Sequence, residues 1–401
     1  MSHEFIAPRM RRVRPSPTAA IADRVRDLQN QGIEIISLGL GELDFDTPPA
    51  ICQGAIDAIT RGETKYTAVG GTVALKSAII GKFARDNHLA FQPEEIIAGA
   101  GAKQLIYNAL QTTLHAGLEA IIPAPYWVSY PDMVALAEGR PVIVPTREQD
   151  GWKLTADALS TAITPHSRWL ILNSPANPTG ALYHRHELQA LAEVLLAAPH
   201  ILILSDDIYE ALHYDGTAFT TLAQVEPRLR HRILTVNGLS KGFSMTGWRL
   251  GYAAGPAWLI KAMTILQSQS TSNPSSLAQA AAVTALTQPA DFLPDWLTTL
   301  DKRRRRILAM LDETPGLCAA PPPAAFYVFV NCGRLLEKRA PTGQWLADDI
   351  AVADYLLTQA HVAVLPGSAF GTPGYLRLAY ALDDELLDMA CRRITAACAL
   401  L

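Results

Sequence analysis

Short apolar segments recur along the first part of the chain and predict the strands of a buried sheet. They cover residues 96–98, 119–122, 142–144, 169–172, 201–204 and 233–236. Between several of them lie stretches of helix length, such as residues 103–114 and 185–196. Strands that alternate with helices indicate a mostly parallel sheet that helices cover on both faces. We therefore predict an α/β fold.

Polar clusters directly follow three of these predicted strands. They occupy residues 173–178, 205–209 and 237–241. In open parallel sheets, ligands bind at the carboxyl ends of the strands. The pattern therefore predicts a ligand site at this edge of the sheet, independently of any motif.

The pattern changes near residue 290, which predicts a second, smaller α+β domain. A long charged helix is followed by an apolar strand at residues 325–330, another helix, and short strands around Val362 and Leu376. We divide the chain into an N-terminal arm with part of the small domain (1–45), a large domain (46–290) and a small C-terminal domain (291–401). Residues 337–347 are expected to form a mobile insertion.

The composition is typical of a globular protein with a large core. Hydrophobic residues make up 49% of the 401 residues and charged residues 18%. The formal net charge of −4 gives no reason to propose a nucleic acid partner. The one basic block, residues 302–306, is expected to form a solvated helix face.

The cysteines and the apolar stretches bear on the cellular compartment. The five cysteines are scattered without a C-x-x-C pair, which argues against a disulfide framework or a zinc site and favours a reducing compartment. The arginine-rich N-terminus lacks a signal-peptide core, and the longest apolar stretch, residues 194–204, is interrupted by Pro199 and His200. We expect a cytoplasmic protein with no membrane partner.

Lys241 is the most informative single residue. Ser240 and Gly242 flank it, and Arg249 follows in a Gly-Trp-Arg turn. The small neighbours would let a flat cofactor approach the backbone, the amine can form a Schiff base, and Ser240 and Arg249 can bind a phosphate. A cofactor that needs both features is pyridoxal phosphate. By itself, the segment is equally compatible with a glycine-rich surface loop.

Two further segments fit the same cofactor. Gly101, Ala102 and Lys103 lie between a predicted strand and helix, where free backbone N–H groups can hold a phosphate; a tight structural turn is the alternative. Trp127 offers a flat ring for stacking on a pyridine, or it belongs to the core.

Asp206 follows four apolar residues, so its carboxylate should emerge at a strand end. Paired with a pyridinium nitrogen at about 3 Å and an effective dielectric near 20, it would gain roughly 5 kcal/mol before desolvation. Even half of that would raise the ring pKa by about two units. The protonated ring would stabilise the carbanion formed when an amino acid loses its α-proton. Tyr209 and Asn177 can donate hydrogen bonds to the phenolic oxygen of the ring.

Arg377 lies in an apolar predicted strand at residues 375–380. A buried arginine without a partner is unfavourable, and its fork matches a carboxylate. The partner is either the carboxylate of a substrate or an internal Asp or Glu.

Taken together, these blocks resemble the class I aminotransferases of fold type I, the aspartate aminotransferase family, and most closely its bacterial branch of broad substrate range. The resemblance extends from Pro15 to the C-terminal helix. Its motifs lie at residues 15–18, 41–48, 65–67, 173–180 and 237–249. Because many matching blocks occur in one order, the resemblance is specific.

The resemblance implies a fold type I architecture whose large domain binds pyridoxal phosphate, and it implies the catalytic roles. Lys241 would be the Schiff-base lysine and then the base that moves the proton. Asp206 and Tyr209 would act with it. The implied cofactor-binding residues are Tyr66, Gly101, Ala102, Lys103, Trp127, Asn177, Asp206, Tyr209, Ser240, Lys241 and Arg249.

The resemblance also implies the substrate contacts and the assembly. Gly41 and Arg377 would hold the α-carboxylate, next to Trp127 and Asn177, and Thr18 and Lys103 would meet the distal carboxylate of an acidic substrate. Tyr66 would reach the phosphate of the neighbouring subunit, so a homodimer is expected.

Four positions depart from the family pattern. Leu43 replaces a proline, Asp207 replaces a glutamate, and Ala102 and Ala324 replace glycines. None of these changes removes a chemical group. They bear on the choice of substrate rather than on cofactor binding.

We therefore expect a transaminase that takes the amine from an amino acid, best aspartate, and passes it to a 2-oxo acid such as 2-oxoglutarate. An aromatic amino acid or prephenate is the alternative substrate. A pyridoxal-phosphate-dependent lyase or decarboxylase would use the same fold. The sensing half of a transcription regulator would need a DNA-binding domain, and only fourteen residues precede Pro15.

Overall fold

The computed structural model describes residues 5–13, 15 and 17–401, and the side chains of residues 17 and 18 lie outside the description. The α-helices are α1 (Pro17–Asn30), α2 (Pro49–Thr60), α3 (Val73–Asn87), α4 (Ala102–Thr113), α5 (Ser129–Leu136), α6 (Ala156–Ala162), α7 (Arg185–Leu196), α8 (Leu222–Val225), α9 (Ala257–Ser268), α10 (Ser276–Thr287), α11 (Leu293–Glu313), α12 (Asp349–Gln359) and α13 (Asp384–Cys398). Short 3₁₀ helices are η2 (Pro8–Arg12), η3 (Pro93–Glu95), η4 (Glu148–Asp150), η5 (Pro227–Arg232), η6 (Gly333–Leu335) and η7 (Gly367–Phe370).

The strands form three sheets. They are β1 (Ile36–Ser37), β2 (Ile96–Gly99), β3 (Glu119–Ala124), β4 (Arg140–Pro145), β5 (Ser167–Asn173), β6 (Leu202–Asp206), β7 (Ile233–Gly238), β8 (Gly251–Ala254), β9 (Tyr327–Asn331), β10 (Val362–Ala363), β11 (Leu365–Pro366) and β12 (Tyr375–Ala379). The largest sheet has seven strands in the order β2-β8-β7-β6-β5-β3-β4.

The seven-stranded sheet is mostly parallel, as predicted. Strand β8 is the exception, because it pairs antiparallel with both β2 and β7. The sequence analysis missed β8, which is four residues long and follows β7 after the connection at residues 239–250. The six strands predicted in the first part of the chain all lie in this sheet.

Adjacent residues of the central strands point to opposite faces of the sheet, and each face has its own core. Ile121 and Leu170 belong to one hydrophobic cluster, whereas Ile122 and Ile171 belong to the other. Because both faces are covered, these strands contain continuous apolar runs instead of alternating ones. This packing fixes where each strand ends, and therefore where the polar residues after it emerge.

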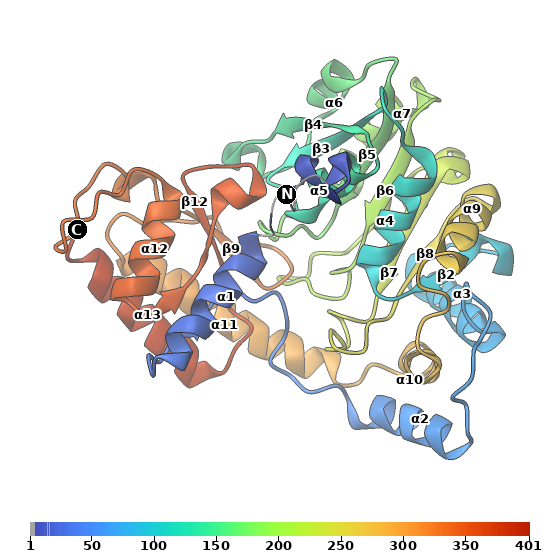
Figure 1. Cartoon of the computed structure of the whole chain (residues 1–401), viewed down its shortest axis with the longest axis horizontal. Coiled ribbons are helices and arrows are strands. Elements are labelled where there is room, and N and C mark those ends of the chain that lie inside the picture. The colour runs from blue at the N-terminus through green and yellow to red at the C-terminus, as the bar shows by residue number, and fades with distance from the viewer. Residues whose placement is uncertain (1–4, 14, 16) are drawn as a thin grey trace.

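The smaller sheets lie with α11, α12 and α13 on one side of the molecule, at the left of Figure 1. One contains β11, β12 and β9, and the other pairs β1 with β10. A third hydrophobic cluster joins these strands and helices, and it includes Ile36 and Leu43 from the N-terminal part of the chain. The division at residues 45/46 and 290/291 stays a prediction.

The basic block on α11 differs from the predicted solvated face. Arg303 and Arg304 are buried, with 6% and 4% of their surfaces exposed. Arg303 pairs with Asp44 and Asp384, and Arg304 with Asp301 and Asp215. The prediction was wrong for these two residues because most of their acidic partners come from distant parts of the sequence.

The predicted insertion at residues 337–347 is a compact turn closed by an antiparallel bridge between Arg339 and Trp345. Its mobility stays a prediction. All five cysteines are free. Among the helices of the described residues, none has the length and apolar character needed to cross a membrane.

Candidate active site

A cavity of about 400 Å³ lies where the parallel strands of the large sheet end. It brings together most of the predicted site residues, namely Gly41, Ala102, Lys103, Trp127, Asn177, Asp206, Tyr209, Ser240, Lys241, Arg249 and Arg377. Strands β2, β3, β5, β6 and β7 all carry residues to this edge, as the polar clusters after the strands had indicated.

Two of the predicted residues that the structure describes do not line this cavity. Gly101 lies just before α4 and caps it, with a positive φ of 90°. Tyr66 is 92% exposed and lies beside a different hollow, near Gln279 of α10. Thr18 belongs to α1, but its side chain lies outside the described residues, as does Ser16 of the same motif.

Lys241 follows β7 and directs its amine into the cavity. Its Nζ donates a hydrogen bond to the backbone oxygen of Gly41 and lies 5.8 Å from the ring centre of Tyr209. Burial, together with the charge of Arg377, lowers the pKa of Lys241 to about 8, although Glu42 opposes the shift. An amine with this pKa is partly neutral near physiological pH, as a nucleophile or a proton acceptor must be.

Asp206 is the last residue of β6, and it is 4% exposed. Its Oδ2 accepts a hydrogen bond from Tyr130 Oη at 2.6 Å, and its Oδ1 accepts one from the Ile208 N–H at 3.4 Å. Burial raises the pKa of Asp206 to about 6, while these hydrogen bonds and Lys241 lower it. A cationic group next to this carboxylate would stabilise its ionised form.

Arg377 on β12 has no acidic partner among the described residues. Its Nη1 donates to Asn177 Oδ1 at 3.0 Å and its Nη2 to the Gly39 backbone oxygen at 2.6 Å, while its buried Nε has no partner. The guanidinium lies 4.5 Å from the ring centre of Tyr327, and burial lowers the pKa of Arg377. A buried cation without an anion is a strong attractor for a carboxylate.

The start of α4 forms a candidate anion site together with Ser240 and Arg249. The helix begins at Ala102, and no side chain caps its first turn. Arg249 Nη1 donates to the Thr246 backbone oxygen at 2.9 Å, and a Cβ on Gly101 would lie 2.6 Å from Nη2 of the same arginine. The glycine thus allows the guanidinium to approach the helix start. Free N–H groups and a cation suit a phosphate.

Trp127 and Lys103 form the wall next to that anion site. Lys103 Nζ lies 4.8 Å from the Trp127 ring centre, and Trp127 meets Tyr130 edge to face at 5.3 Å. Burial lowers the pKa of Lys103, and the charge of Arg249 lowers it further. Because both residues line the cavity, they are available to a ligand.

The sequence analysis did not assign several lining residues to the site. These are Gly39, Leu40, Glu42, Ile106, Tyr130, Asn173, Ile208, Thr246 and Tyr327. Asn173 was within reach of the reasoning, because it ends β5. Tyr130 and Tyr327 belong to hydrophobic clusters, and each hydroxyl has a polar partner, such as Tyr209 Oη at 2.8 Å from Tyr327 Oη. No pattern in the sequence indicates the polar partners of these hydroxyl groups.

The four family departures lie in different places. Ala102 lines the cavity, and Asp207 is buried beside Ser205, whose hydroxyl donates to Asp207 Oδ1 at 2.7 Å. Leu43 packs in the hydrophobic cluster of the small sheets. Ala324 is buried, and its backbone oxygen would be 2.5 Å from a Cβ on Gly180, which explains the glycine there.

Comparison with known proteins gives a consistent result. The model of the family "Aminotransferase class I and II" matches residues 33–394. The chain is 50% identical to the aspartate/prephenate aminotransferase of Cereibacter sphaeroides over 395 residues, covering 98% of this chain and 99% of that protein. It is 48% identical to the aspartate aminotransferase of Rhizobium meliloti over 392 residues, covering 98% of this chain and 96% of that protein.

Solved structures agree with this result. The crystal structure of the Rhizobium meliloti aspartate aminotransferase superposes with a TM-score of 0.96 and 48% identity, covering 99% of each chain. The Thermus thermophilus aspartate aminotransferase with maleate superposes with a TM-score of 0.90 and 39% identity, covering 98% of this chain and 99% of that one. The chain therefore belongs to the class I and II aminotransferases, and it is a pyridoxal-phosphate-dependent enzyme of fold type I.

Proposed function

We propose that this enzyme transfers the amino group of aspartate to 2-oxoglutarate, and that the cavity at the sheet edge is its active site. The observation that carries the proposal is the joint presence of Lys241, Asp206 and Arg377 in one cavity. They provide an amine with a lowered pKa, a buried carboxylate, and a buried guanidinium that has no acidic partner in the described part of the chain.

The residues fit pyridoxal phosphate at both ends. The α4 start, Ser240 and Arg249 would hold the phosphate, and Asp206 would keep a proton on the ring nitrogen. The oxygen of the Asn177 amide is engaged by Arg377, so its NH₂ group is the end that would donate to the phenolic oxygen, together with Tyr209. When bound, the cofactor supplies an electron sink for the charge left by the departing α-proton.

The protein groups around the substrate would then orient it and move its proton. Arg377 would bind the α-carboxylate through its fork, next to the backbone of Gly41. The Lys241 amine would take the proton from the α-carbon of the substrate and move it to the cofactor. A pKa of about 8 suits this exchange, because both protonation states are populated near neutral pH.

The charge of the cavity favours an acidic substrate. Its lining holds the cations Lys103, Lys241, Arg249 and Arg377 but only the carboxylates Asp206 and Glu42. The cofactor phosphate would neutralise part of this positive charge, and the positive charge that remains suits a dicarboxylic amino acid. An aromatic amino acid or prephenate is the second candidate, because several relatives are named aspartate/prephenate aminotransferases and Trp127 and Tyr130 border the cavity.

We further propose a homodimer in which Tyr66 completes the site of the neighbouring subunit. Its ring is almost fully exposed, and Ile56 and Ile59 of α2 and Val73 of α3 are large apolar residues that are exposed as well. Exposed apolar side chains that gather in one region are typical of a protein interface. We place the enzyme in the cytoplasm, where free thiols such as those of its cysteines persist.

Covalent trapping of the cofactor tests the assignment. Borohydride reduction of the holoenzyme should fix pyridoxal phosphate on the peptide that contains Lys241, and Lys241→Ala should lose nearly all transamination. Label on another lysine would overturn the site. A panel of amino acids with 2-oxoglutarate would identify the donor, and release of ammonia or carbon dioxide would point to a lyase or decarboxylase.

A further inference from the structure

The cavity has one wall that is not part of a helix or strand. Residues 39–47, which we call the front loop, run from β1 towards α2 without regular secondary structure, and residues 39–42 line the cavity. The backbone of this loop directly contacts two side chains of the proposed active site. The Gly39 oxygen accepts from Arg377, and the Gly41 oxygen accepts from Lys241. Its position therefore matters to both side chains.

The front loop has little freedom where it faces the cavity. A Cβ on Gly41 would lie 3.0 Å from Tyr327 Oη, so the backbone passes close to that ring. A small displacement of the loop would change the distance from its backbone to Lys241 and Arg377. Such displacements reduce the efficiency of an active site even when every reacting group is present.

One side of the front loop is fastened to the connection between β7 and β8, which also carries Lys241. Thr246 Oγ1 donates to Glu42 Oε2 at 2.9 Å, and Thr47 Oγ1 donates to the Ser244 backbone oxygen at 2.8 Å. Trp248 Nε1 donates to Thr47 Oγ1 at 3.0 Å. These contacts hold the loop from the side of the large sheet.

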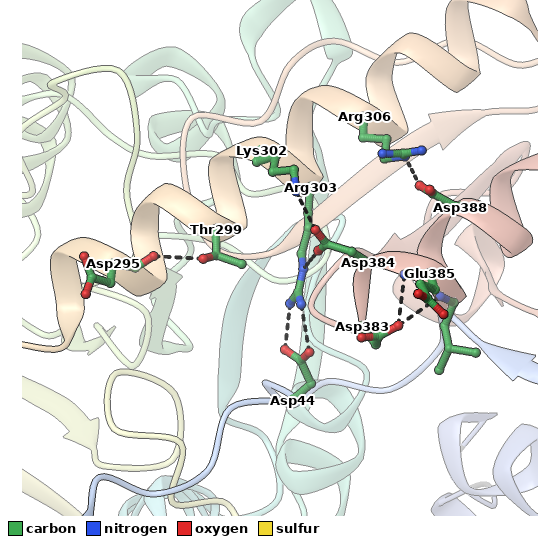
Figure 2. A network of polar contacts seen from close by, with 11 residues as sticks. Asp44, Asp295, Thr299, Lys302, Arg303, Arg306, Asp383, Asp384, Glu385 and Asp388 are labelled. Atoms are coloured by element: carbon green, nitrogen blue, oxygen red, sulfur yellow. Dashed lines mark hydrogen bonds and ion pairs between the residues drawn. The ribbon is translucent and has the colours of Figure 1, made fainter.

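On its other side, the front loop is joined to α11 by the guanidinium of Arg303 and by packing of Phe45 (Figure 2). Arg303 of α11 donates from Nη1 and Nη2 to the two carboxylate oxygens of Asp44, at 2.7 and 3.0 Å, and from Nε to Asp384 at 2.8 Å. The same guanidinium lies 5.6 Å from the ring centre of Phe45, which stacks on Trp296 of α11 at 4.7 Å.

We call the paired hydrogen bonds between Arg303 and Asp44 the clamp, and their geometry is specific to arginine. A planar fork that meets a carboxylate with two parallel hydrogen bonds fixes both distance and angle, whereas an ammonium group is a point charge. Arg303 is 6% exposed, so water cannot readily replace a lost contact. Asp384, at the start of α13, accepts from the third guanidinium nitrogen, Nε, so that α11 and α13 together anchor the loop.

We propose that Arg303 is a positioning residue for substrate binding: through Asp44 it holds the front loop where the Gly41 backbone faces the amino acid. This inference rests on the proposed function of the cavity as the amino acid site. Arg303 does not line the cavity, so it acts through the loop and not by contact. Cofactor binding, which depends on other walls of the cavity, should not require the clamp.

The matched control lies one helical turn away. Arg306 on α11 pairs with Asp388 on α13, so it joins the same two helices, but it does not contact the front loop. Arg306→Lys therefore makes the same substitution in the same helix, at a side chain that is 47% exposed instead of 7%. A general weakening of the α11–α13 contact would affect both variants, whereas loss of loop positioning would affect only Arg303→Lys.

The test compares wild-type holoenzyme with Arg303→Lys, Asp44→Asn, the double variant and Arg306→Lys. Three quantities are measured: the Kd of pyridoxal phosphate, the Kd of maleate as a dicarboxylate probe, and amide hydrogen exchange in residues 39–47. For Arg303→Lys and Asp44→Asn we expect the Kd of maleate to rise by about 10-fold or more, with faster exchange confined to the front loop and its Arg303 contacts. The Kd of the cofactor should change less than about 2-fold, and the double variant should be little worse than either single variant.

The proposal is overturned if Arg303→Lys matches Arg306→Lys in exchange over residues 39–47, or if the Kd of maleate is unchanged while the loop exchanges faster. Asp44→Asn keeps the test valid if Arg303→Lys does not fold, because it removes the same contact from the loop side. Failure of the proposed function would look different. In that case the wild-type holoenzyme itself would not bind maleate. Amide hydrogen exchange in residues 39–47 would still show whether Arg303 holds the front loop.

Discussion

Tyr130 Oη donates a hydrogen bond to Oδ2 of Asp206 at 2.6 Å, between the first turn of α5 and the end of β6. Both side chains are buried. Burial raises the pKa of Asp206 to about 6, and the Tyr130 hydroxyl counteracts the shift because it stabilises the ionised carboxylate. Tyr130 thus orients Asp206 and favours the charge state that a protonated ring nitrogen needs.

Tyr130→Phe should weaken cofactor binding and shift its pH dependence. Without the hydroxyl, the pKa of Asp206 rises above about 6. In the proposed site the ionised form of Asp206 binds the ring nitrogen, so the acid limb of cofactor binding should move to higher pH. A hydrogen bond to a charged group contributes about 1.5–3 kcal/mol, or roughly 10- to 150-fold in Kd. The check is the Kd of pyridoxal phosphate measured from pH 5 to pH 9.

Tyr183→Phe is the control for this change. Tyr183 is also buried and accepts a hydrogen bond from the Leu154 N–H at 2.7 Å, but the structure gives it no contact with Asp206. It should leave the acid limb in place even if it destabilises the fold. If the acid limb of Tyr130→Phe coincided with that of the wild type, the hydroxyl would have no role in tuning Asp206.

The sequence predicted which residues gather in the cavity best where these residues lie at the end of a strand. Asp206 and Lys241 follow apolar runs, and the carboxyl ends of parallel strands meet at one edge, so the pattern alone placed them together. The sequence could not reveal Tyr130 or Tyr327. Both rings belong to hydrophobic clusters, and no periodicity in the sequence indicates the polar contacts that their hydroxyl groups make.

The second limit of the sequence analysis concerns ion pairs between segments that lie far apart in the sequence. Arg303 lies in a basic run that is typical of a solvated helix face, yet Asp44 lies 259 positions away in the sequence and meets it in the fold. A charge pattern within one helix cannot show this. Strand β8 was missed for a different reason: its four residues, Gly251–Ala254, are small or aromatic and form no extended apolar run.

Lys241 should show an unusually low pKa in the cofactor-free enzyme. An ordinary lysine has a pKa near 10.5, and burial lowers that of Lys241 to about 8, with a contribution from Arg377. A lowered pKa means that the neutral, reactive amine appears at lower pH. Labelling by an amine reagent, followed by mass spectrometry, should have its midpoint near pH 8 at Lys241.

Arg377→Gln should move that midpoint upwards, because removal of a nearby positive charge makes the ammonium form more favourable. The exposed lysines of the same sample serve as internal references. A midpoint near pH 10.5 in the wild type would contradict the lowered pKa, and an unchanged midpoint in Arg377→Gln would remove Arg377 as one of its causes.

Lys103 should distinguish acidic from aromatic substrates. Its Nζ lies 4.8 Å from the Trp127 ring centre, on the cavity wall, so it does not simply extend into solvent. If it meets the distal carboxylate, Lys103→Met should lower kcat/KM for aspartate by roughly 10- to 150-fold, the effect of one charge-assisted contact, and affect phenylalanine much less. Thr18→Val tests the other predicted contact in the same assay.

An equal loss for both substrates would instead place Lys103 at the phosphate end, since burial and Arg249 lower its pKa there. No loss for either substrate would exclude it from binding. Both outcomes would move the best guess for the amine donor from aspartate to an aromatic amino acid.

Mixing of subunits should reveal whether Tyr66 serves the neighbouring site. Tyr66 is exposed and does not line the cavity of its own chain, whereas Lys241 does. If Tyr66 reaches across a two-fold interface, a hybrid of Tyr66→Phe and Lys241→Ala subunits contains one site with both residues intact and one site that lacks both. Activity should therefore rise when the two weak variants are mixed and allowed to exchange subunits.

The activity of the mixture could instead stay at the average of the two variants although native mass spectrometry detects hybrid dimers. That result would assign Tyr66 to its own subunit or to neither site. A monomer with full activity at assay concentration would exclude the shared site altogether.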